Sequence, residues 1–162
     1  MTNKVFNVLI LCTGNSARSI MAEALFNQFG QGRFRAFSAG SKPTGRVNPC
    51  AIEQVAELGY DTVSLRSKSW DEFAQADAPK MDIVITVCDN AAGEVCPIWP
   101  GTPVSGHWSF EDPAAAEGSD EEIRQAFGLI REQIQHCVER FISMPLETMS
   151  NADIKRALDN SK

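Results

Sequence analysis

The sequence predicts an α/β protein in which helices wrap both faces of a four-stranded parallel sheet, giving a single-domain, three-layer sandwich. Strand-like and helix-like segments alternate along the chain, which is the pattern of a parallel sheet with helical crossovers. One run, residues 82–88, is largely apolar, as expected of a central strand covered on both faces. The chain has 162 residues, 43% of them hydrophobic, which is enough for one domain with a substantial core.

Four segments have the length and composition of strands. Residues 5–11 form an apolar run, and residues 35–39 form a shorter one that leads into a loop rich in Gly and Pro. Residues 82–88 are expected to form the third strand. Residues 102–107 are expected to form the fourth, although Pro103 lacks the N–H that a strand residue donates.

Helical signals follow the strands in order. Residues 19–29 place apolar side chains four positions apart on one face, and Gly30 ends this helix. Residues 49–58 form a helix that begins with Asn48 as its cap and a proline at its first position. Residues 69–76 predict a shorter helix.

The last predicted helix is also the longest. Ser119 and Glu122 form a capping box at its start, and it extends to about residue 142. Its apolar face consists of Ile123, Phe127, Ile130, Ile134, Cys137 and Phe141. The residues that follow are expected either to form one more short helix or to be disordered.

Charge and composition exclude several classes of partner. A net charge of −6 argues against binding to nucleic acid or to an anionic membrane surface. The apolar run near the N-terminus is too short for a signal peptide or a membrane span. Five cysteines are an odd number without a secreted disulfide framework around them, so we expect a reducing, cytoplasmic location. We also expect a monomer.

The loop between the first strand and the first helix carries the strongest functional signal. Cys12 ends the strand, and Arg18 follows six positions later at the start of the helix. The residues between them are Thr13, Gly14, Asn15, Ser16 and Ala17. Such a loop can turn successive N–H groups inward at the positive end of a helix, which predicts a socket for a tetrahedral oxyanion. The same field predicts that Cys12 is a thiolate near neutral pH.

The alternative for this loop is a small buried thiol beside a surface arginine. The placement between a strand and a helix favours the functional interpretation, because functional loops in such sheets lie beyond the carboxyl ends of the strands. Cys88 ends the third strand, and Asp112 follows the fourth. All three groups are therefore expected at one edge of the sheet.

Cys88 and Cys96 could form a second functional pair. Seven small or polar residues separate them, so a disulfide between them is feasible. They are either a redox pair that is oxidised through Cys12 or two unrelated buried thiols. A zinc site is disfavoured, because the spacing is unusual and only His107 and His136 could complete it, so we expect no metal. Cys137 and Cys50 are interpreted as structural.

Asp112 is a candidate general acid. Pro113 behind it restricts the backbone, and a carboxylic acid next to an oxyanion socket could protonate a leaving oxygen. The alternatives are an ordinary acidic turn, or the neighbouring Glu111 in the same role.

Taken together, these motifs resemble the arsenate reductases built on the low-molecular-weight protein tyrosine phosphatase fold. The matching segments are residues 12–19, Ser38-Ala39-Gly40, Val87-Cys88-Asp89, Cys96-Pro97, His107-Trp108 and Asp112-Pro113-Ala114. The resemblance implies flavodoxin-like topology and covers about residues 5–142. We therefore assign residues 1–143 to a catalytic domain and residues 144–162 to a C-terminal tail.

The resemblance implies a triple-cysteine relay that reduces arsenate and serves arsenic detoxification, with phosphate or sulfate as competing anions and no cofactor. Cys12 would attack arsenate, which Arg18 and the loop amides hold, while Asp112 protonates the departing hydroxide. Cys88 would then take up the oxidising equivalents, and Cys96 would resolve the resulting disulfide. Ser19 would hydrogen-bond the Cys12 thiolate, and Asn15 would brace the loop.

The sequence departs from the family pattern at two places. Some members bind potassium through an Asn, a Ser and a downstream Asp, whereas Asn15 and Ser38 here are accompanied by Lys68 and no such Asp. We expect the Lys68 ammonium to take the place of the ion. The gap from Cys88 to Cys96 is also one residue longer than in thioredoxin-coupled members, so both thioredoxin and a glutathione–glutaredoxin couple are open as reductants.

Two other functions compete with arsenate reduction. A phosphatase acting on phosphotyrosine needs only Cys12, Arg18 and Asp112. Those phosphatases usually carry a second Cys in the loop, where this chain has Ala17, and a Tyr after the Asp-Pro pair, where it has alanines. A sensor of anions or of redox state is the second rival, but a plain binding module has little use for a thiol that invites oxidation.

Overall fold

The computed structural model describes residues 4–88 and 103–162, and in these ranges four parallel strands form one sheet. The strands are β1 (Phe6–Leu11), β2 (Phe34–Ala39), β3 (Ile83–Thr86) and β4 (Val104–His107), in the order β2-β1-β3-β4. This order confirms the predicted parallel sheet and its flavodoxin-like topology. β1 pairs with β2 on one side and with β3 on the other, so the order in which strands are added to the sheet reverses at β1. The loop after β1 therefore lies at this switch point.

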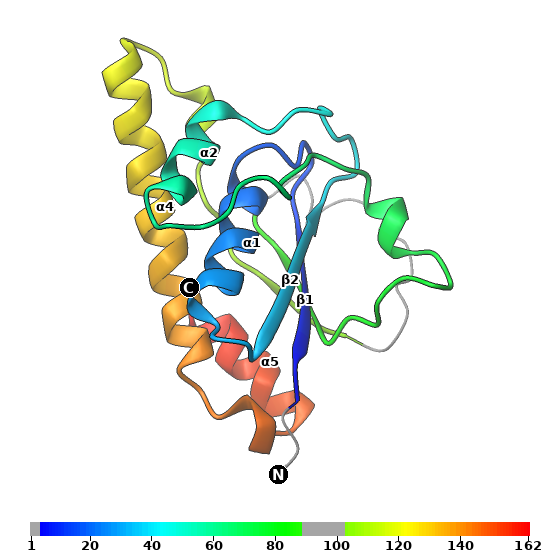
Figure 1. The fold of residues 1–162 in the computed structure, drawn as a ribbon. Coiled ribbons are helices and arrows are strands. Elements are labelled where there is room, and N and C mark those ends of the chain that lie inside the picture. The colour runs from blue at the N-terminus through cyan, green and yellow to red at the C-terminus, as the bar shows by residue number, and fades with distance from the viewer. Residues whose placement is uncertain (1–3, 89–102) are drawn as a thin grey trace.

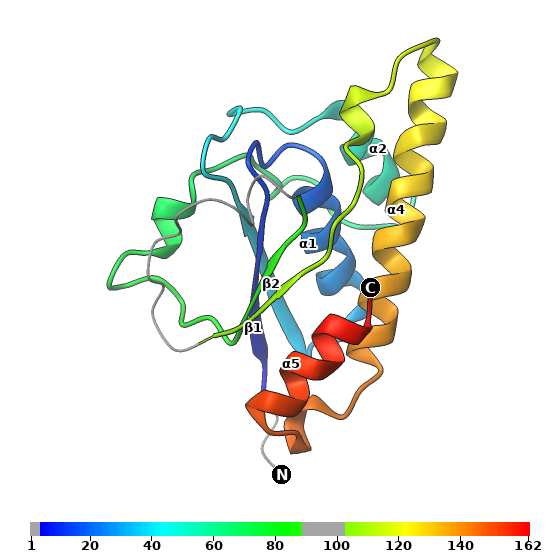
Figure 2. The same cartoon turned by 180° about the vertical axis from the view of Figure 1, so that it is seen from behind.

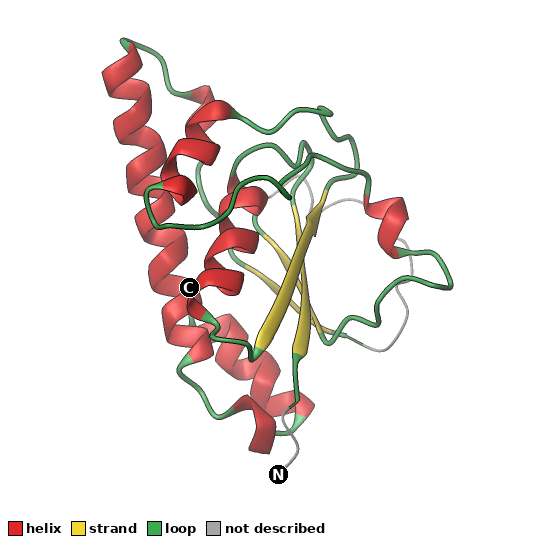
Figure 3. Cartoon of the chain, viewed as in Figure 1, coloured by secondary structure: helices red, strands yellow, loops and turns green. Residues whose placement is uncertain are grey.

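The long helices lie together on one face of the sheet (Figures 1 and 3). They are α1 (Arg18–Phe29), α2 (Pro49–Ala56), α4 (Asp120–Ile142) and α5 (Asn151–Asn160). The largest apolar cluster fills the space between this face and the helices, with Phe26, Trp108 and Phe141 fully buried. Burial of such aromatic side chains is the main term that stabilises the layer.

The other face of the sheet carries a smaller cluster. Leu9, Leu11 and Val84 project from the strands and meet Trp70 and Phe73 of the short 3-10 helix η1 (Trp70–Phe73). The predicted helix over residues 69–76 was wrong in length and type, because the chain makes only one tight turn there. That turn buries two aromatic side chains three positions apart, and Ser69 caps it.

The remaining element boundaries differ from the predictions by a few residues. The helix expected to reach residue 58 ends at Ala56, and Gly59 with φ +84° completes the turn in a conformation that suits glycine. The capping box of Ser119 and Glu122 is present, and α4 ends at the predicted residue. β3 ends at Thr86, two residues earlier than expected, so Cys88 already lies beyond the sheet edge.

The residues after α4 are helical. They form the 3-10 turn η3 (Leu146–Thr148) and then α5, which packs against β4 beside α4 (Figure 2). Arg33 anchors the turn between the two helices, because its guanidinium donates to the carbonyls of Ile142 and Met144 and pairs with Glu147. Among the described helices, none combines the length and the apolar character that a membrane crossing requires.

Candidate active site

Residues 12–18, which we call the oxyanion loop, connect β1 to α1 at the carboxyl edge of the sheet. Three of the loop carbonyls point outward and accept backbone N–H groups of the segment that follows β2. These bonds are Lys42 N to Thr13 O (3.0 Å), Thr44 N to Gly14 O (3.0 Å) and Asn48 N to Ser16 O (2.8 Å). In a trans peptide the next N–H points the opposite way, so the N–H groups of Gly14, Asn15 and Ala17 turn inward.

Gly40 allows this close approach of the two segments. A Cβ atom at this position would lie 2.3 Å from the carbonyl oxygen of Thr13 and 2.7 Å from that of Cys12. Its backbone is also fixed, since its N–H donates to Lys68 O at 3.0 Å and its carbonyl accepts from Trp70 N at 2.9 Å. The glycine in the Ser38-Ala39-Gly40 motif is thus a packing requirement of the loop.

The oxyanion loop surrounds a cavity of about 250 Å³. All of its residues line this cavity, together with Thr44, Cys88 and Asp112. The loop, the second thiol and the acid that the sequence analysis expected at one edge therefore meet in a single space. Glu111, the alternative acid, is not among the lining residues.

Asn15 fixes the shape of the loop. Its backbone is in the left-handed region with φ 48°, which Asn tolerates better than most residues. Its buried side chain donates to Ser19 Oγ at 2.8 Å and to Ser38 Oγ at 3.0 Å, and accepts from the backbone N–H of Lys68 at 2.9 Å. These bonds tie the loop to α1, to β2 and to the segment before η1.

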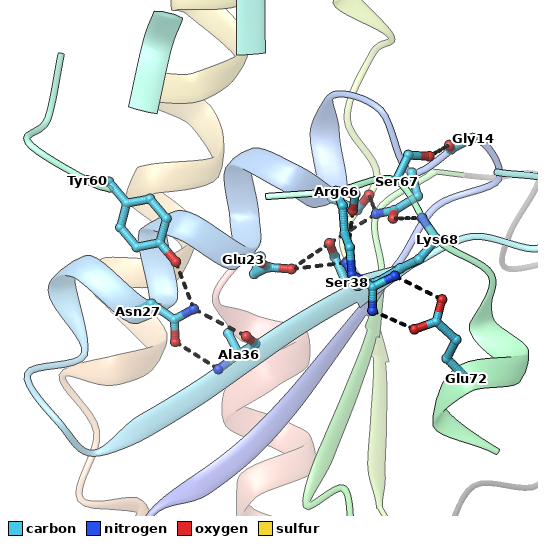
Figure 4. Close-up of polar contacts among 12 residues, drawn as sticks. Gly14, Glu23, Asn27, Ala36, Ser38, Tyr60, Arg66, Ser67, Lys68 and Glu72 are labelled. Carbon is cyan, nitrogen blue, oxygen red and sulfur yellow. Dashed lines mark hydrogen bonds and ion pairs between the residues drawn. The ribbon is translucent and has the colours of Figure 1, made fainter. Parts of the chain in front are cut away.

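Lys68, whose backbone N–H binds Asn15, forms a buried ion pair with Glu23 (Figure 4). The two side chains are 8% and 10% exposed, and Lys68 Nζ lies 3.7 Å from Glu23 Oε1. Lys68 Nζ also donates to the carbonyl of Arg66 at 3.0 Å, and Ser38 Oγ donates to Glu23 Oε1 at 2.7 Å. Within the described residues, no group of acidic, His and Cys side chains is arranged to hold a metal ion.

Sequence analysis missed Glu23. A signal existed: Ser19, Glu23 and Asn27 recur every four residues along α1 and form a polar stripe on a helix that is buried from Ser19 to Phe26. This stripe faces β2, since Asn27 binds both backbone groups of Ala36 while Glu23 binds Ser38. Burial raises the pKa of Glu23 and lowers that of Lys68, and in each case the charge of the partner opposes the shift.

Cys12 and Cys88 face each other as reduced thiols within hydrogen-bond contact. This hydrogen bond and then burial raise the pKa of Cys12, while the positive charge of Arg18 and the backbone N–H of Thr13 lower it. The prediction that Cys12 is a thiolate near neutral pH was therefore wrong for the reduced pair. It counted the groups that stabilise the thiolate and omitted a second sulfur that stabilises the protonated form.

Arg18 links the loop to the acid. Its guanidinium donates to the carbonyl of Phe110 at 2.9 Å and lies 3.8 Å from Asp112 Oδ2. Asp112 in turn accepts from the backbone N–H of Ala114 at 3.0 Å, at the start of the 3-10 turn η2 (Pro113–Ala115). The carboxylate is thus oriented by a cap, and nearly half of its side-chain surface is exposed to solvent.

The other cysteines are separate from this cavity or outside the described residues. Cys50 is half-buried on α2 and Cys137 is buried on α4, and neither lines the cavity. Cys96 lies outside the described residues, so its pairing with Cys88 stays a prediction. Ser19 accepts from Asn15, and its predicted bond to Cys12 also stays a prediction.

A family model described as low molecular weight phosphotyrosine protein phosphatase matches residues 7–151. The chain belongs to this phosphatase family. It is 38% identical over 141 residues to an arsenate reductase of Halalkalibacterium halodurans, a match that covers 87% of this chain and 96% of the relative.

Two solved structures agree with this family assignment. An arsenate reductase in the phosphate binding state superposes with a TM-score of 0.68 at 30% identity, over 86% of this chain and 98% of its own length. A thioredoxin-dependent arsenate reductase of Corynebacterium glutamicum superposes with a TM-score of 0.52 at 30% identity, over 83% of this chain and 64% of its own. This chain is thus similar to arsenate reductases that have the fold of the phosphatase family.

The buried ion pair gives a prediction about stability. Lys68→Met should lower the free energy of unfolding by about 3 kcal/mol, because it leaves the Glu23 carboxylate buried without its partner. Adding Glu23→Gln should restore most of the loss, since the amide oxygen can still accept from Ser38. Urea denaturation of the single and double variants measures both effects, and a double variant no more stable than Lys68→Met would contradict this account.

The thiol pair gives a prediction about pH. Cys88→Ala removes the largest cause of the raised pKa, so the pH midpoint for alkylation of Cys12 by iodoacetamide should fall. Peptide mass spectrometry across a pH series reports the modification of Cys12 alone, and Cys50→Ala serves as the control that should leave the midpoint in place. A midpoint that stays the same or rises in Cys88→Ala would refute the coupling of the two thiols.

Proposed function

We propose that this phosphatase-family protein reduces arsenate to arsenite by a relay of three thiols, Cys12, Cys88 and Cys96. The observation that carries the proposal is the contact between Cys12 and Cys88 inside the cavity that Arg18 and the loop amides also line. A phosphatase needs only the first of these sulfurs. The similarity to arsenate reductases over most of the chain supports the same activity.

Arsenate is the substrate that the cavity suits. Its tetrahedral oxygens can accept the inward N–H groups of the oxyanion loop and the guanidinium of Arg18, which lies at the amino end of α1. These donors are fixed before the anion arrives, because the outward carbonyls and Asn15 already hold the loop. Phosphate and sulfate present similar oxygens and should compete.

The first chemical step joins sulfur to arsenic. The Cys12 thiolate attacks the arsenic atom, an S–As bond forms, and an As–O bond breaks as Asp112 delivers a proton so that the oxygen leaves as water. Asp112 lies beside Arg18 and lines the cavity, which supports this role. Because the contact with Cys88 and burial raise the pKa of Cys12, the step begins with transfer of the Cys12 proton to an anionic oxygen of the bound arsenate.

The second step is the reduction. The Cys88 thiolate attacks the Cys12 sulfur, an S–S bond forms, and the electron pair of the S–As bond passes to arsenic. Arsenic(V) becomes arsenic(III) and leaves as arsenite, while the two sulfurs are oxidised to a disulfide. Thr13 Oγ1 lies 3.7 Å from Cys88 Sγ and helps to position the attacking sulfur.

Cys96 and an external dithiol complete the cycle. A Cys96 thiolate attacks the Cys88 sulfur, releases the Cys12 thiolate and leaves a Cys88–Cys96 disulfide, which takes two electrons from the reductant. The likeness to a thioredoxin-dependent reductase supports thioredoxin as this reductant. Turnover with thioredoxin compared with glutathione plus glutaredoxin measures the choice directly.

Ser19, Ser38 and Lys68 are proposed as positioning residues. Ser19 Oγ accepts from Asn15, which leaves its own proton for the sulfur of Cys12. Ser38 and Lys68 hold Asn15 and Glu23, so the Lys68 ammonium supplies the positive charge beneath the loop.

The cavity favours a small inorganic anion over a tyrosyl phosphate. Among the residues that the structure describes, no aromatic side chain lines it. The sole tyrosine, Tyr60, hydrogen-bonds Asn27 and lines a different cavity, and the residues after Asp112 form the small turn η2. Within residues 4–88 and 103–162, a phosphoaryl ring would therefore find no flat partner in the cavity to stack on.

The relay is tested by separating the two activities that the loop allows. Cys88→Ser should reduce arsenate turnover to background, because arsenic can no longer receive the electron pair, yet leave slow hydrolysis of an aryl phosphate largely intact. Cys12→Ser should end both activities. Fast aryl phosphate hydrolysis without arsenate reduction in the unmodified protein would favour the phosphatase interpretation instead.

A further inference from the structure

The position of Arg18 depends on a short segment that follows β4. Its guanidinium donates to the Phe110 carbonyl at 2.9 Å, and Asp112 lies 3.8 Å away on the same segment. A guanidinium has a fixed, planar set of donors, so the direction of this acceptor decides which N–H groups remain for an anion. The position of Arg18 therefore depends on the contacts that hold the segment from Trp108 to Asp112 in place.

The outer support of this segment comes from α5. Trp108 is fully buried, and its indole N–H donates to the carbonyl of Leu158 at 2.8 Å. The Trp108 ring stacks on Phe26 of α1 with 6.1 Å between the ring centres and an interplanar angle of 8°. Trp108 is therefore held between α1, which begins with Arg18, and α5.

A second contact reaches Phe110 itself. The ammonium of Lys162 lies 5.0 Å from the centre of the Phe110 ring, within the range of a cation–π interaction. Arg140 of α4 donates to the carbonyl of Ser161 at 3.3 Å and so ties the end of this stretch to the core. The residues after α4 thus contact both aromatic side chains of the segment that carries the Arg18 acceptor.

The fit between α5 and β4 is close. A Cβ atom on Gly106 of β4 would lie 2.4 Å from Leu158 Cδ2, so Leu158 occupies the space that a side chain would fill there. Leu158 is fully buried, and Figure 2 shows α5 against the sheet beside α4. Such interlocking transmits a displacement of α5 to β4 and to the residues that follow it.

This support lies mostly beyond the residues that the family model matches. The family model ends at residue 151, where α5 begins, and the Halalkalibacterium halodurans relative is matched along 96% of its length by 87% of this chain. The contacts of Leu158 and Lys162 are therefore made by residues beyond the family match.

We propose that α5 is a positioning element of the oxyanion site, acting through Trp108 and Phe110 on the guanidinium of Arg18. Leu158 and Lys162 hold the segment after β4, and that segment presents the Phe110 carbonyl and Asp112 to Arg18. The inference rests on the proposed function only in taking the oxyanion loop as the anion site. It is otherwise independent of the relay, since neither Cys88 nor Cys96 takes part.

The test measures binding of inorganic phosphate by titration calorimetry, at a temperature where every variant is folded. Leu158→Ala should raise the dissociation constant about fivefold, which corresponds to about 1 kcal/mol of lost coupling between α5 and the anion site. Met81→Ala is the matched control: Met81 is 2% exposed and belongs to the cluster on the other face of the sheet, so this variant loses stability without loss of affinity. Lys162→Gln, an exposed change that leaves the core intact, should weaken binding by a smaller factor.

A double variant separates positioning from general loosening. In an Arg18→Lys background, the planar guanidinium that donates to the Phe110 carbonyl is absent. Leu158→Ala should therefore weaken phosphate binding no further in this background. Equal phosphate affinity in wild type and Leu158→Ala would overturn this inference and leave the proposed function standing, as would an equal loss in Met81→Ala. A wild-type protein that binds no phosphate would instead overturn the anion site and with it the proposed function.

Discussion

The side chain of Asn15 is the constraint on which the site depends. A loop that turns its N–H groups inward must also turn its carbonyls outward, and one residue must enter the left-handed region to make the turn. Asn15 does so with φ 48° and binds three separate elements through one amide. The buried pair of Glu23 and Lys68 beneath it stabilises this arrangement only while both partners are present. The anion site therefore extends well below the residues that line the cavity.

The two thiols show a conflict built into a relay of this kind. Cys88 must lie close to Cys12 if it is to attack the sulfur bound to arsenic, and the same closeness raises the pKa of Cys12. Arg18 and the Thr13 N–H lower this pKa, so the pKa of Cys12 depends on a balance between neighbouring groups. In a phosphatase of this fold without the second thiol, no neighbouring sulfur raises the pKa of the cysteine in the loop. In the proposed relay, the thiol contact would thus both permit reduction and restrain the first step.

Much of this could be predicted from the sequence, for reasons that differ between elements. The alternation of apolar runs and capped helices predicted the parallel sheet, and the rule that functional loops follow parallel strands placed Cys12, Cys88 and Asp112 at one edge. The 3-10 turn at Trp70 was missed because helical spacing over a few residues does not distinguish one turn from several. Glu23 was missed because a charged residue on a helix is ordinarily exposed. The raised pKa of Cys12 depends on a contact between residues 76 positions apart in the chain, which spacing alone does not reveal.

The central claim is that oxidising equivalents pass from the sulfur in the oxyanion loop to Cys88 and then away from the loop. The most direct measurement is peptide mapping by mass spectrometry after a single turnover with arsenate in the absence of any added reductant. The account predicts one disulfide, between Cys88 and Cys96, with Cys12 again reduced. A disulfide that includes Cys50 or Cys137, or arsenite formed with all five thiols intact, would contradict it.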